Sequence, residues 1–220
     1  MERTVIIVAG GSGTRMGAEI PKQFLRIKER SILEHTIKKF YSFDDQIEMI
    51  IVLPKDQISR WKDYCIENYL SIPHIVAEGG ETRFHSVLNG LNVVTKKGVI
   101  AIHDGVRPCV SHNTLNNCFN HVEDNGAVIP VVELVDSIRE IKNTTSNAVD
   151  RSKYRLVQTP QTFLWEVIWS AYQQDYSPLF TDDASVVEQN GHKISLVPGN
   201  RENIKVTTKE DLKWIEPFLK

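Results

Sequence analysis

The chain has 220 residues, with 26 Lys and Arg against 28 Asp and Glu and a formal net charge of −2. This length predicts one domain, whose core buries about 70% of the surface that the unfolded chain exposes. The balanced charge argues against a protein that coats DNA or RNA, because such binding needs a surplus of cations. We therefore expect no nucleic-acid partner, although a local cationic pocket for a small anion is compatible with this charge.

Cysteine usage and hydropathy limit the cellular setting. Three cysteines, Cys65, Cys109 and Cys118, are too few and too scattered for a disulfide framework or a zinc site. The longest apolar runs are about a quarter of the length of a membrane-spanning helix, and no signal region precedes the first strand-like segment. We expect a soluble cytoplasmic protein with reduced thiols and no membrane partner.

Runs rich in Val and Ile alternate with longer amphipathic stretches, a pattern typical of βα units around a mostly parallel sheet. Strands are predicted at 4–9, 49–53, 74–77, 99–103, 127–132 and 193–197. Helices are predicted at 31–41, 56–69, 82–94, 111–125, 164–174, 182–190 and 208–218. Thr207 and Glu210 have the spacing of a capping box at the start of the last helix.

Residues 134–158 interrupt this alternation with a polar stretch. Turn-forming residues occupy 143–147, between short alternating stretches at 137–141 and 148–151. The insertion is too long for an ordinary βα loop, so a protruding β-hairpin arm is expected. A floppy surface insertion is the alternative; as an arm, the segment would grip a second subunit. The fold class predicted for residues 1–220 is therefore α/β, a single Rossmann-like three-layer domain with a mostly parallel mixed sheet and this arm.

A glycine-rich loop, A-G-G-S-G-T-R-M-G at 9–17, follows the first strand. Glycines let backbone N–H groups approach a ligand closely, and ligands of open α/β sheets bind at the carboxyl ends of strands. The loop is not a Walker motif, because no lysine follows its glycines, and Met16 stands where the dinucleotide fingerprint needs its third glycine. Arg15 and Lys22 add two cations that can straddle a polyphosphate.

The same run, followed by P-K-Q-F at 21–24, resembles the signature of nucleotidyltransferases with the nucleotide-diphospho-sugar transferase fold. In that family the glycine loop, with its Arg and Lys, holds a nucleoside triphosphate. The resemblance implies catalytic roles for Arg15 and Lys22, which would stabilise phosphate charge during transfer. It implies nucleotide binding by Ala9, Gly10, Gly11, Ser12, Gly13, Arg15 and Lys22.

The segment H-D-G-V-R-P at 103–108 follows another strand. An Asp in this place, Asp104, is suited to hold Mg²⁺ or another divalent cation, and Arg107 adds a positive charge. The segment resembles the H-D-x-x-R-P motif of the 2-C-methyl-D-erythritol 4-phosphate cytidylyltransferases of isoprenoid precursor synthesis. Two alanines are usual in that motif where this chain has Gly105 and Val106. His103 is the one histidine for which we expect more than a structural role.

A further segment, G-G-E-T-R-F-H-S at 79–86, predicts by itself only a helix start capped by Thr82. It also matches the pattern G-G-x-x-R-x-x-S of the same family. This resemblance implies that Gly80, Arg83 and Ser86 surround the cytosine and ribose of CTP, and that Asp104 and Gly105 complete the CTP site.

Motifs farther along the chain imply a site for the acceptor. The elements T-P-Q at 159–161 and N-I-K-V-T at 203–207 match the same family, and T-D-D-A at 181–184 resembles a family element that we interpret as a helix cap or a support for the site. By resemblance, Arg151 and Lys205 are catalytic as well, and Ser137 and Arg151 reach the neighbouring site of a homodimer. The acceptor would be bound by Arg107, Ser137, Arg151, Thr159 and Lys205.

The expected function is transfer of CMP from CTP to 2-C-methyl-D-erythritol 4-phosphate, giving 4-diphosphocytidyl-2-C-methyl-D-erythritol and pyrophosphate. No Ser-His-Asp or Cys-His arrangement is needed, because a phosphate monoester with a second pKa of about 6 is already deprotonated at neutral pH. The nearest alternative is a ribitol 5-phosphate cytidylyltransferase, which uses the same chemistry on another acceptor. A nucleotide-sugar pyrophosphorylase, a Rossmann dehydrogenase and a non-catalytic nucleotide-binding protein are further alternatives.

Overall fold

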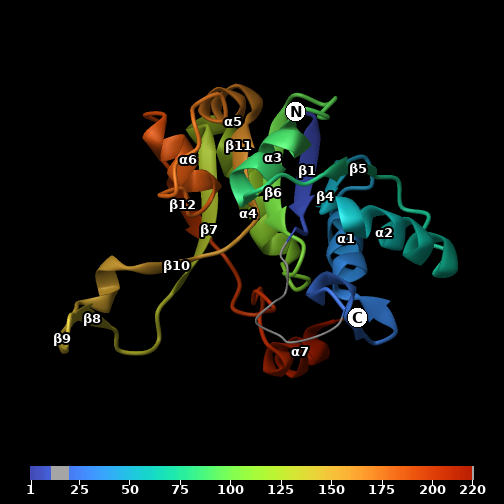
Figure 1. The fold of residues 1–220 in the computed structure, drawn as a ribbon. Coiled ribbons are helices and arrows are strands. Elements are labelled where there is room, and N and C mark those ends of the chain that lie inside the picture. Colours follow the sequence, from blue (N-terminus) through green and yellow to red (C-terminus); the bar gives the residue numbers. More distant parts are fainter. Residues whose placement is uncertain (11–19, 220) are drawn as a thin grey trace.

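The central strands are apolar at almost every position because helices cover both faces of their sheet. The computed structural model describes residues 1–10 and 20–219, and Figure 1 shows its three layers. The sheet contains β1 (Arg3–Val8), β4 (Glu48–Leu53), β5 (Ile75–Glu78), β6 (Val99–Asp104), β7 (Ala127–Glu133), β10 (Arg155–Val157), β11 (Gln161–Leu164) and β12 (Ser195–Pro198). Their order is β10-β7-β11-β6-β1-β4-β5, and β12 pairs with β7.

The sheet is mixed, and its largest parallel part is formed by strands from the N-terminal half of the chain. The four strands β5, β4, β1 and β6 run parallel to one another, and β12 runs parallel to β7. Strand β11 is antiparallel to both of its neighbours, β6 and β7, and β10 is antiparallel to β7. The predicted α/β fold with a mostly parallel mixed sheet is thus confirmed.

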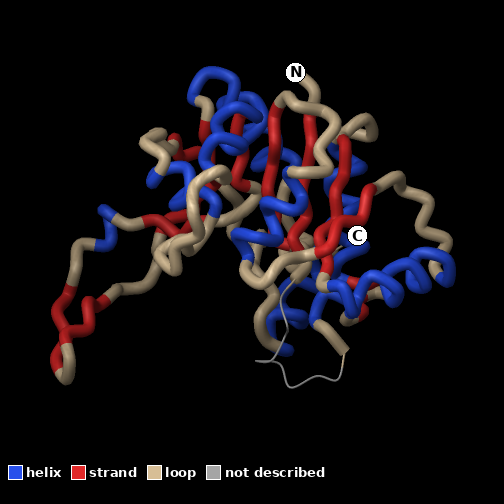
Figure 2. The backbone as a smooth tube through the Cα atoms, turned by 45° about the horizontal axis from the view of Figure 1, so that its top comes forward, coloured by secondary structure: helices blue, strands red, loops and turns tan. Residues whose placement is uncertain are grey.

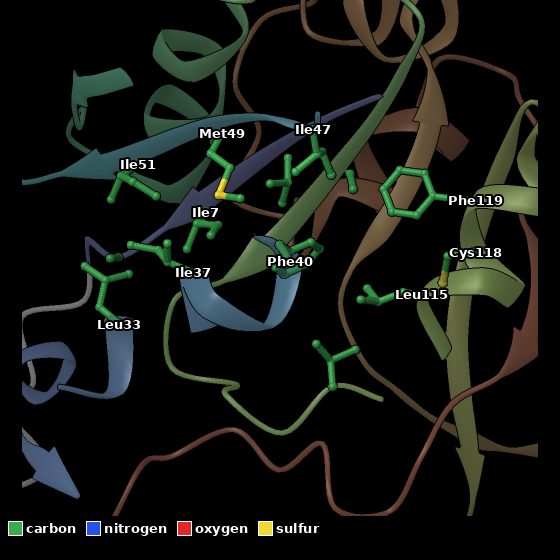
Figure 3. Packing of buried hydrophobic residues seen from close by; sticks show 14 of the residues in the cluster. Ile7, Leu33, Ile37, Phe40, Ile47, Met49, Ile51, Leu115, Cys118 and Phe119 are labelled. Atoms are coloured by element: carbon green, nitrogen blue, oxygen red, sulfur yellow. The ribbon is translucent and has the colours of Figure 1, made fainter. Parts of the chain in front are cut away.

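Alternate side chains of each strand enter two separate cores. Ile7 packs on one face against α1 (Ile32–Phe43), α2 (Lys55–Glu67) and α4 (His112–Asn125), as Figure 3 shows in part. Ile6 packs on the other face against α3 (Arg83–Leu91), α5 (Trp165–Ala171) and α6 (Asp183–Gln189). Full burial of one such side chain stabilises the fold by about 2 kcal/mol.

A third, smaller cluster lies beyond the carboxyl ends of the strands. It joins the short ribbon of β2 (Arg26–Ile27) and β3 (Arg30–Ser31) to α7 (Lys209–Ile215), through contacts that include Val106 and Val206. The backbone N–H of Val206 donates to the carbonyl of Val106 at 2.9 Å. This cluster places the loop after β6 against the segment that leads into α7, and η4 (Glu216–Phe218) ends the helix.

The arm extends away from the body of the molecule (Figures 1 and 2). It is a hairpin of β8 (Arg139–Lys142) and β9 (Thr145–Ala148), followed by η3 (Arg151–Lys153). The predicted hairpin is confirmed, but its predicted turn at 143–147 is wrong. Lys142 pairs with Thr145, so only two residues turn the chain, and Asn143 takes the left-handed φ of 52° that Asn tolerates.

Every predicted strand and helix is present, but β2, β3, β10 and β11 were not predicted, and the helix predicted to begin at 164 begins at Trp165, directly after β11. Gln161 and Thr162 are polar and fully buried in the middle of the sheet, a pattern that apolar periodicity cannot reveal. The capping box of the last helix also lies one residue later than predicted. Thr208 caps α7 with Asp211, because the Asp211 carboxylate accepts the backbone N–H groups of both Thr207 and Thr208.

No helix among the described residues is long and apolar enough to cross a lipid bilayer.

Glu48 at the start of β4 ties together the amino ends of the central strands. Its carboxylate accepts hydrogen bonds from the Thr4 hydroxyl at 2.9 Å and from the backbone N–H groups of Thr95 and Lys96. Burial alone raises the pKa of Glu48, but these hydrogen bonds outweigh it and lower the pKa below its ordinary value of 4.5. The ionised form is therefore favoured by folding.

We expect Glu48→Gln to lower the free energy of unfolding by about 1–3 kcal/mol at pH 7, because the new amide opposes the donors of Thr95 and Lys96. The contribution of a carboxylate with a lowered pKa is present above pH 4.5 and is lost as the pH falls below it. The difference between the two proteins should therefore shrink in urea unfolding at pH 4. A difference that is unchanged at pH 4 would contradict this account.

Candidate active site

A cavity of about 350 Å³ opens at the carboxyl ends of the parallel strands, and we call it the cleft. This volume lies at the small end of the range for ligand sites, about 300–1,000 Å³. The cleft forms there because β1 and β6 end together, with Val8 paired to Asp104. Its lining residues are Val8, Ala9, Gly10, Lys22, Gln23, Gly80, Glu81, Thr82, Arg83, Ser86, Asp104, Val106 and Lys205.

Lys22 enters the cleft from the short 3₁₀ turn η2 (Lys22–Phe24). The neighbouring Gln23 is fully buried and donates from Nε2 to the carbonyl of Ala9 at 2.7 Å and to the side chain of Gln57. This amide therefore fixes the Lys22 turn against the end of β1 and the start of α2. Of the other predicted phosphate-loop residues, Gly11, Ser12, Gly13 and Arg15 lie outside the described residues.

The segment before α3 forms a tight turn along one wall of the cleft. Gly80 donates its backbone N–H to the Ser86 hydroxyl at 3.1 Å, and that hydroxyl donates to the carbonyl of Thr82 at 2.9 Å. A Cβ on Gly80 would lie 2.4 Å from the Cβ of His85, so only glycine fits here. Thr82 is the N-cap of α3, as the sequence predicts.

Asp104 ends β6 and brings a carboxylate into the cationic cleft. Its Oδ2 lies 3.1 Å from Arg107 Nε and 3.1 Å from Lys205 Nζ. Burial alone raises the pKa of Asp104, but Lys205, Arg83 and Arg107 together hold the pKa well below its ordinary value. The group is therefore a carboxylate throughout the physiological range, and it draws Lys205 and Arg107 together from distant parts of the chain.

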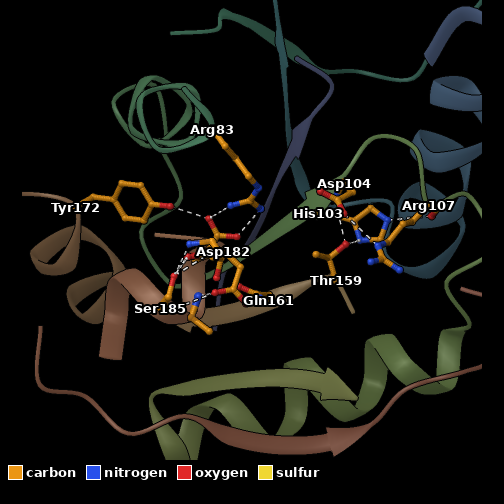
Figure 4. Close-up of polar contacts among 12 residues, drawn as sticks. Arg83, His103, Asp104, Arg107, Thr159, Gln161, Tyr172, Asp182 and Ser185 are labelled. Atoms are coloured by element: carbon orange, nitrogen blue, oxygen red, sulfur yellow. Dashed lines mark hydrogen bonds and ion pairs between the residues drawn. The ribbon is translucent and has the colours of Figure 1, made fainter. Parts of the chain in front are cut away.

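His103 and Thr159 hold the segment around Asp104 in place, as Figure 4 shows. His103 is fully buried, which lowers its pKa to about 4, so the ring is neutral at pH 7. Its Nε2 faces the carbonyl of Arg107 at 3.0 Å and must donate, so its Nδ1 accepts from the Thr159 hydroxyl, also at 3.0 Å. The same hydroxyl accepts the backbone N–H of Asp104 at 3.1 Å. His103 thus holds both ends of the Asp104–Arg107 turn.

Of the predicted site residues that the structure describes, eight line the cleft, and those of the arm do not. Arg107 and Thr159 contact Asp104 directly. Arg107 also donates to the carbonyl of Asn203 at 2.7 Å. Ser137 and Arg151 are exposed on the arm, outside the cleft of their own chain, and Arg151 donates to the carbonyl of Val135. Their predicted roles remain predictions.

Three buried polar residues that hold the site together were not predicted as site residues. Gln23 supports Lys22, and Asn203 donates from Nδ2 to the carbonyl of Thr159 at 2.8 Å while its own carbonyl accepts from Arg107. Asp183 pairs with Arg83 through two contacts of 2.6 Å. The signal was present in P-K-Q-F, N-I-K-V-T and T-D-D-A, where each of these residues lies inside a motif.

The cationic side chains of the cleft suit phosphate groups, and Asp104 is a side chain there that could bind a metal ion. In the described part of the chain, no three His, Cys, Asp or Glu side chains are grouped closely enough to hold a metal ion by themselves. The contacts of the Asp104 carboxylate with Arg107 and Lys205 given above are both made through Oδ2. Mg²⁺ is commonly bound by one or two carboxylates together with substrate phosphates, so this donor set fits Mg²⁺ that is carried by a nucleotide.

Comparisons with known proteins agree on one family. A family model described as 2-C-methyl-D-erythritol 4-phosphate cytidylyltransferase matches residues 3–220. A protein of that name from Bacteroides thetaiotaomicron is 49% identical over 213 residues, which are 97% of each chain. Another from Clostridioides difficile is 36% identical over 220 residues, covering 98% of this chain and 93% of its own. The crystal structure of a protein of that name from Francisella tularensis has a TM-score of 0.81 and 28% identity, with 100% of both chains covered.

Gly105 marks the closest approach of the two strand ends that form the cleft. A Cβ at this position would lie 2.9 Å from the Cβ of Ala9 and 3.3 Å from the carbonyl oxygen of Val8. We expect Gly105→Ala to lower the free energy of unfolding by about 1–3 kcal/mol, because overpacking forces β1 and β6 apart. Because Ala9 lines the cleft, nucleotide affinity should fall as well. If the variant is as stable as the wild type in urea and its nucleotide affinity is unchanged, the ends of β1 and β6 can accommodate a methyl group at position 105, and the prediction is wrong.

Proposed function

The chain belongs to the family of 2-C-methyl-D-erythritol 4-phosphate cytidylyltransferases, and from this premise we propose how its cleft performs the reaction. It transfers CMP from CTP to 2-C-methyl-D-erythritol 4-phosphate, forming 4-diphosphocytidyl-2-C-methyl-D-erythritol and pyrophosphate. The observation that carries this conclusion is the family match over residues 3–220. Relatives at 49% and 36% identity bear the same name, which favours this acceptor over ribitol 5-phosphate.

In this reaction a phosphate oxygen of the acceptor attacks the α-phosphorus of CTP. A new O–P bond forms while the bond from the α-phosphorus to pyrophosphate breaks. The attacking phosphate has a second pKa of about 6 and needs no general base at neutral pH. Because two polyanions must meet, the catalytic work consists of alignment and charge stabilisation.

We propose that the two lysines of the cleft divide this work. Lys22, together with Arg15, contacts the triphosphate, and Lys205 contacts the phosphate of the acceptor. Their positions support this division, since Lys22 follows the glycine-rich segment in the chain and Lys205 lines the cleft beside Asp104. Ala9, Gly10, Gly80, Arg83 and Ser86 then form the wall around the nucleotide.

We propose that the enzyme depends on Mg²⁺, with Asp104 as the ligand from the protein. The metal would neutralise charge on the CTP phosphates when bound. The Asp104 carboxylate is kept ionised by Lys205, Arg83 and Arg107, so it is available to a cation at neutral pH. Arg107 and Thr159 keep that carboxylate in place.

We also propose that the chain acts as a single catalytic domain in a cytoplasmic homodimer, and that the arm brings Ser137 and Arg151 to the acceptor site of the partner subunit. The support lies in the arm itself. Ile141 in β8 and Leu156 in the adjoining edge strand β10 are 71% and 53% exposed, and an isolated two-stranded hairpin is marginally stable in water. A second subunit would cover these apolar side chains.

Purified protein with CTP and Mg²⁺ should release pyrophosphate with 2-C-methyl-D-erythritol 4-phosphate, and at least about tenfold more slowly with ribitol 5-phosphate. A coupled pyrophosphate assay measures both rates. Addition of EDTA should stop the reaction, and excess Mg²⁺ should restore it. Equal or faster turnover of ribitol 5-phosphate would contradict the assigned acceptor, and full activity in EDTA would contradict the metal dependence.

A mixture of two inactive variants tests the role of the arm in the partner's site. Lys22→Ala and Arg151→Ala should each lose at least about 100-fold in turnover, because each removes a charge that stabilises the transition state. After the two are unfolded together and refolded, activity should return to about a quarter of the wild-type value, since half of the dimers are mixed and each mixed dimer keeps one intact site. The same treatment of each variant alone is the control. Failure to recover activity would place Arg151 in the site of its own chain.

A further inference from the structure

Arg83 is held by a carboxylate from a distant part of the chain. Its two terminal nitrogens donate to the two oxygens of Asp183, each at 2.6 Å, across 100 residues of sequence. Asp183 has no exposed surface, whereas the Arg83 side chain is 30% exposed and lines the cleft. Figure 4 shows the Arg83 guanidinium directed at α6, the helix that begins with Asp183. The pair thus joins a wall of the cleft to a buried anchor.

The anchor is itself fixed from several sides. The hydroxyl of Tyr172, at the end of α5, donates to Asp183 Oδ1 at 2.7 Å, and the Tyr172 ring stacks on Phe84 at 4.7 Å between centroids. Burial alone lowers the pKa of Arg83, but the Asp183 carboxylate outweighs it and raises the pKa, so the guanidinium stays charged. A bidentate pair of this kind restricts both the position and the plane of the guanidinium.

The neighbouring segment links this anchor to the other side of the cleft. Gln161 in β11 is fully buried, donates to Asp182 at 2.7 Å and accepts the backbone N–H of Ala184 at 2.8 Å. Gln161 follows Thr159 closely in the chain, and Thr159 holds Asp104. Gln161 thus holds the start of α6, which carries Asp183, while Thr159, two residues earlier in the chain, holds Asp104.

The pairing also decides what Arg83 is suited to recognise. A guanidinium whose charge is offset by a buried carboxylate adds little attraction for a triphosphate. Its remaining N–H donors and its fixed plane are still available for neutral acceptor groups. The cleft leaves the phosphates to Lys22 and Lys205, while Arg83 lies beside Gly80 and Ser86.

We propose that Asp183 is a positioning residue for nucleotide binding, which acts through Arg83 to hold a rigid set of donors against the nucleoside half of CTP. The phosphates are not part of this contact. Tyr172 supports the same arrangement by orienting the Asp183 carboxylate. This inference rests on the proposed function of the cleft and adds a residue that has no contact with substrate.

The variant Asp183→Asn tests the proposal, because it keeps the volume of the side chain but sets an amide against Arg83. We expect the Kd of CMP and the KM of CTP to rise by about tenfold or more, with kcat and the inhibition constant of pyrophosphate changed by less than about threefold. Pyrophosphate reports the phosphate half of the site. An unchanged Kd of CMP would overturn the proposal, and so would an equal loss of CMP and pyrophosphate binding, which indicates collapse of the cleft.

Glu188→Gln is the matched control, since it removes an exposed carboxylate from the same helix, α6, at a position outside the cleft. Its Kd for CMP should match the wild type, and a loss as large as that of Asp183→Asn would overturn the proposal. The double variant Arg83→Gln/Asp183→Asn should bind CMP as Arg83→Gln alone does. This comparison also decides the matter if Asp183→Asn does not fold, because the double variant leaves no unpaired charge. A further loss in the double variant would mean that Asp183 acts independently of Arg83.

Failure of the role proposed for Asp183 can be distinguished from failure of the proposed function. Wild-type protein without cytidylyltransferase activity would contradict the function itself. An active wild type whose Asp183→Asn variant binds CMP normally would contradict only the role of Asp183.

Discussion

The parallel pairing of β1 with β6 is the constraint on which the cleft depends, because it sets Val8 opposite Asp104. The chain leaves both strands at one edge of the sheet, so the start of the glycine loop and the Asp104 carboxylate meet there. A slip of one residue would turn Asp104 to the other face of the sheet. Gly105, which has no side chain, lets the two strand ends approach each other closely.

Two buried carboxylates balance the cations that this edge collects. Asp104 holds Lys205 and Arg107, and Asp183 holds Arg83. Each carboxylate would be costly to bury alone, and each cation would repel its neighbours without it. These three cations are therefore held in place before any phosphate binds. A near-neutral chain can in this way carry a site for two phosphorylated substrates, since its positive charges are few and gathered in one place.

The predictions from sequence succeeded where a local pattern reports the structure directly. Strands such as β1 and β6 are apolar at successive positions, and motifs such as P-K-Q-F follow their ends, so the family, the sheet and most of the cleft were predicted. The hairpin was predicted from turn residues, although its turn is shorter than expected. The prediction failed for β11, since Gln161 and Thr162 are polar residues in a buried strand.

The sequence by itself determined the alternation of strands and helices, the place of each motif at a strand end and the residues of the cationic cleft, because these follow from periodicity and local backbone chemistry. Only the tertiary structure decided which buried partner each of these residues has. Gln23 finds Gln57, Asn203 finds Thr159, and Arg83 finds Asp183, all from distant segments. It also separated Ser137 and Arg151 from the cleft of their own chain. The physical reason is that a buried polar group must be satisfied by whatever packing brings within reach, and packing depends on the whole fold.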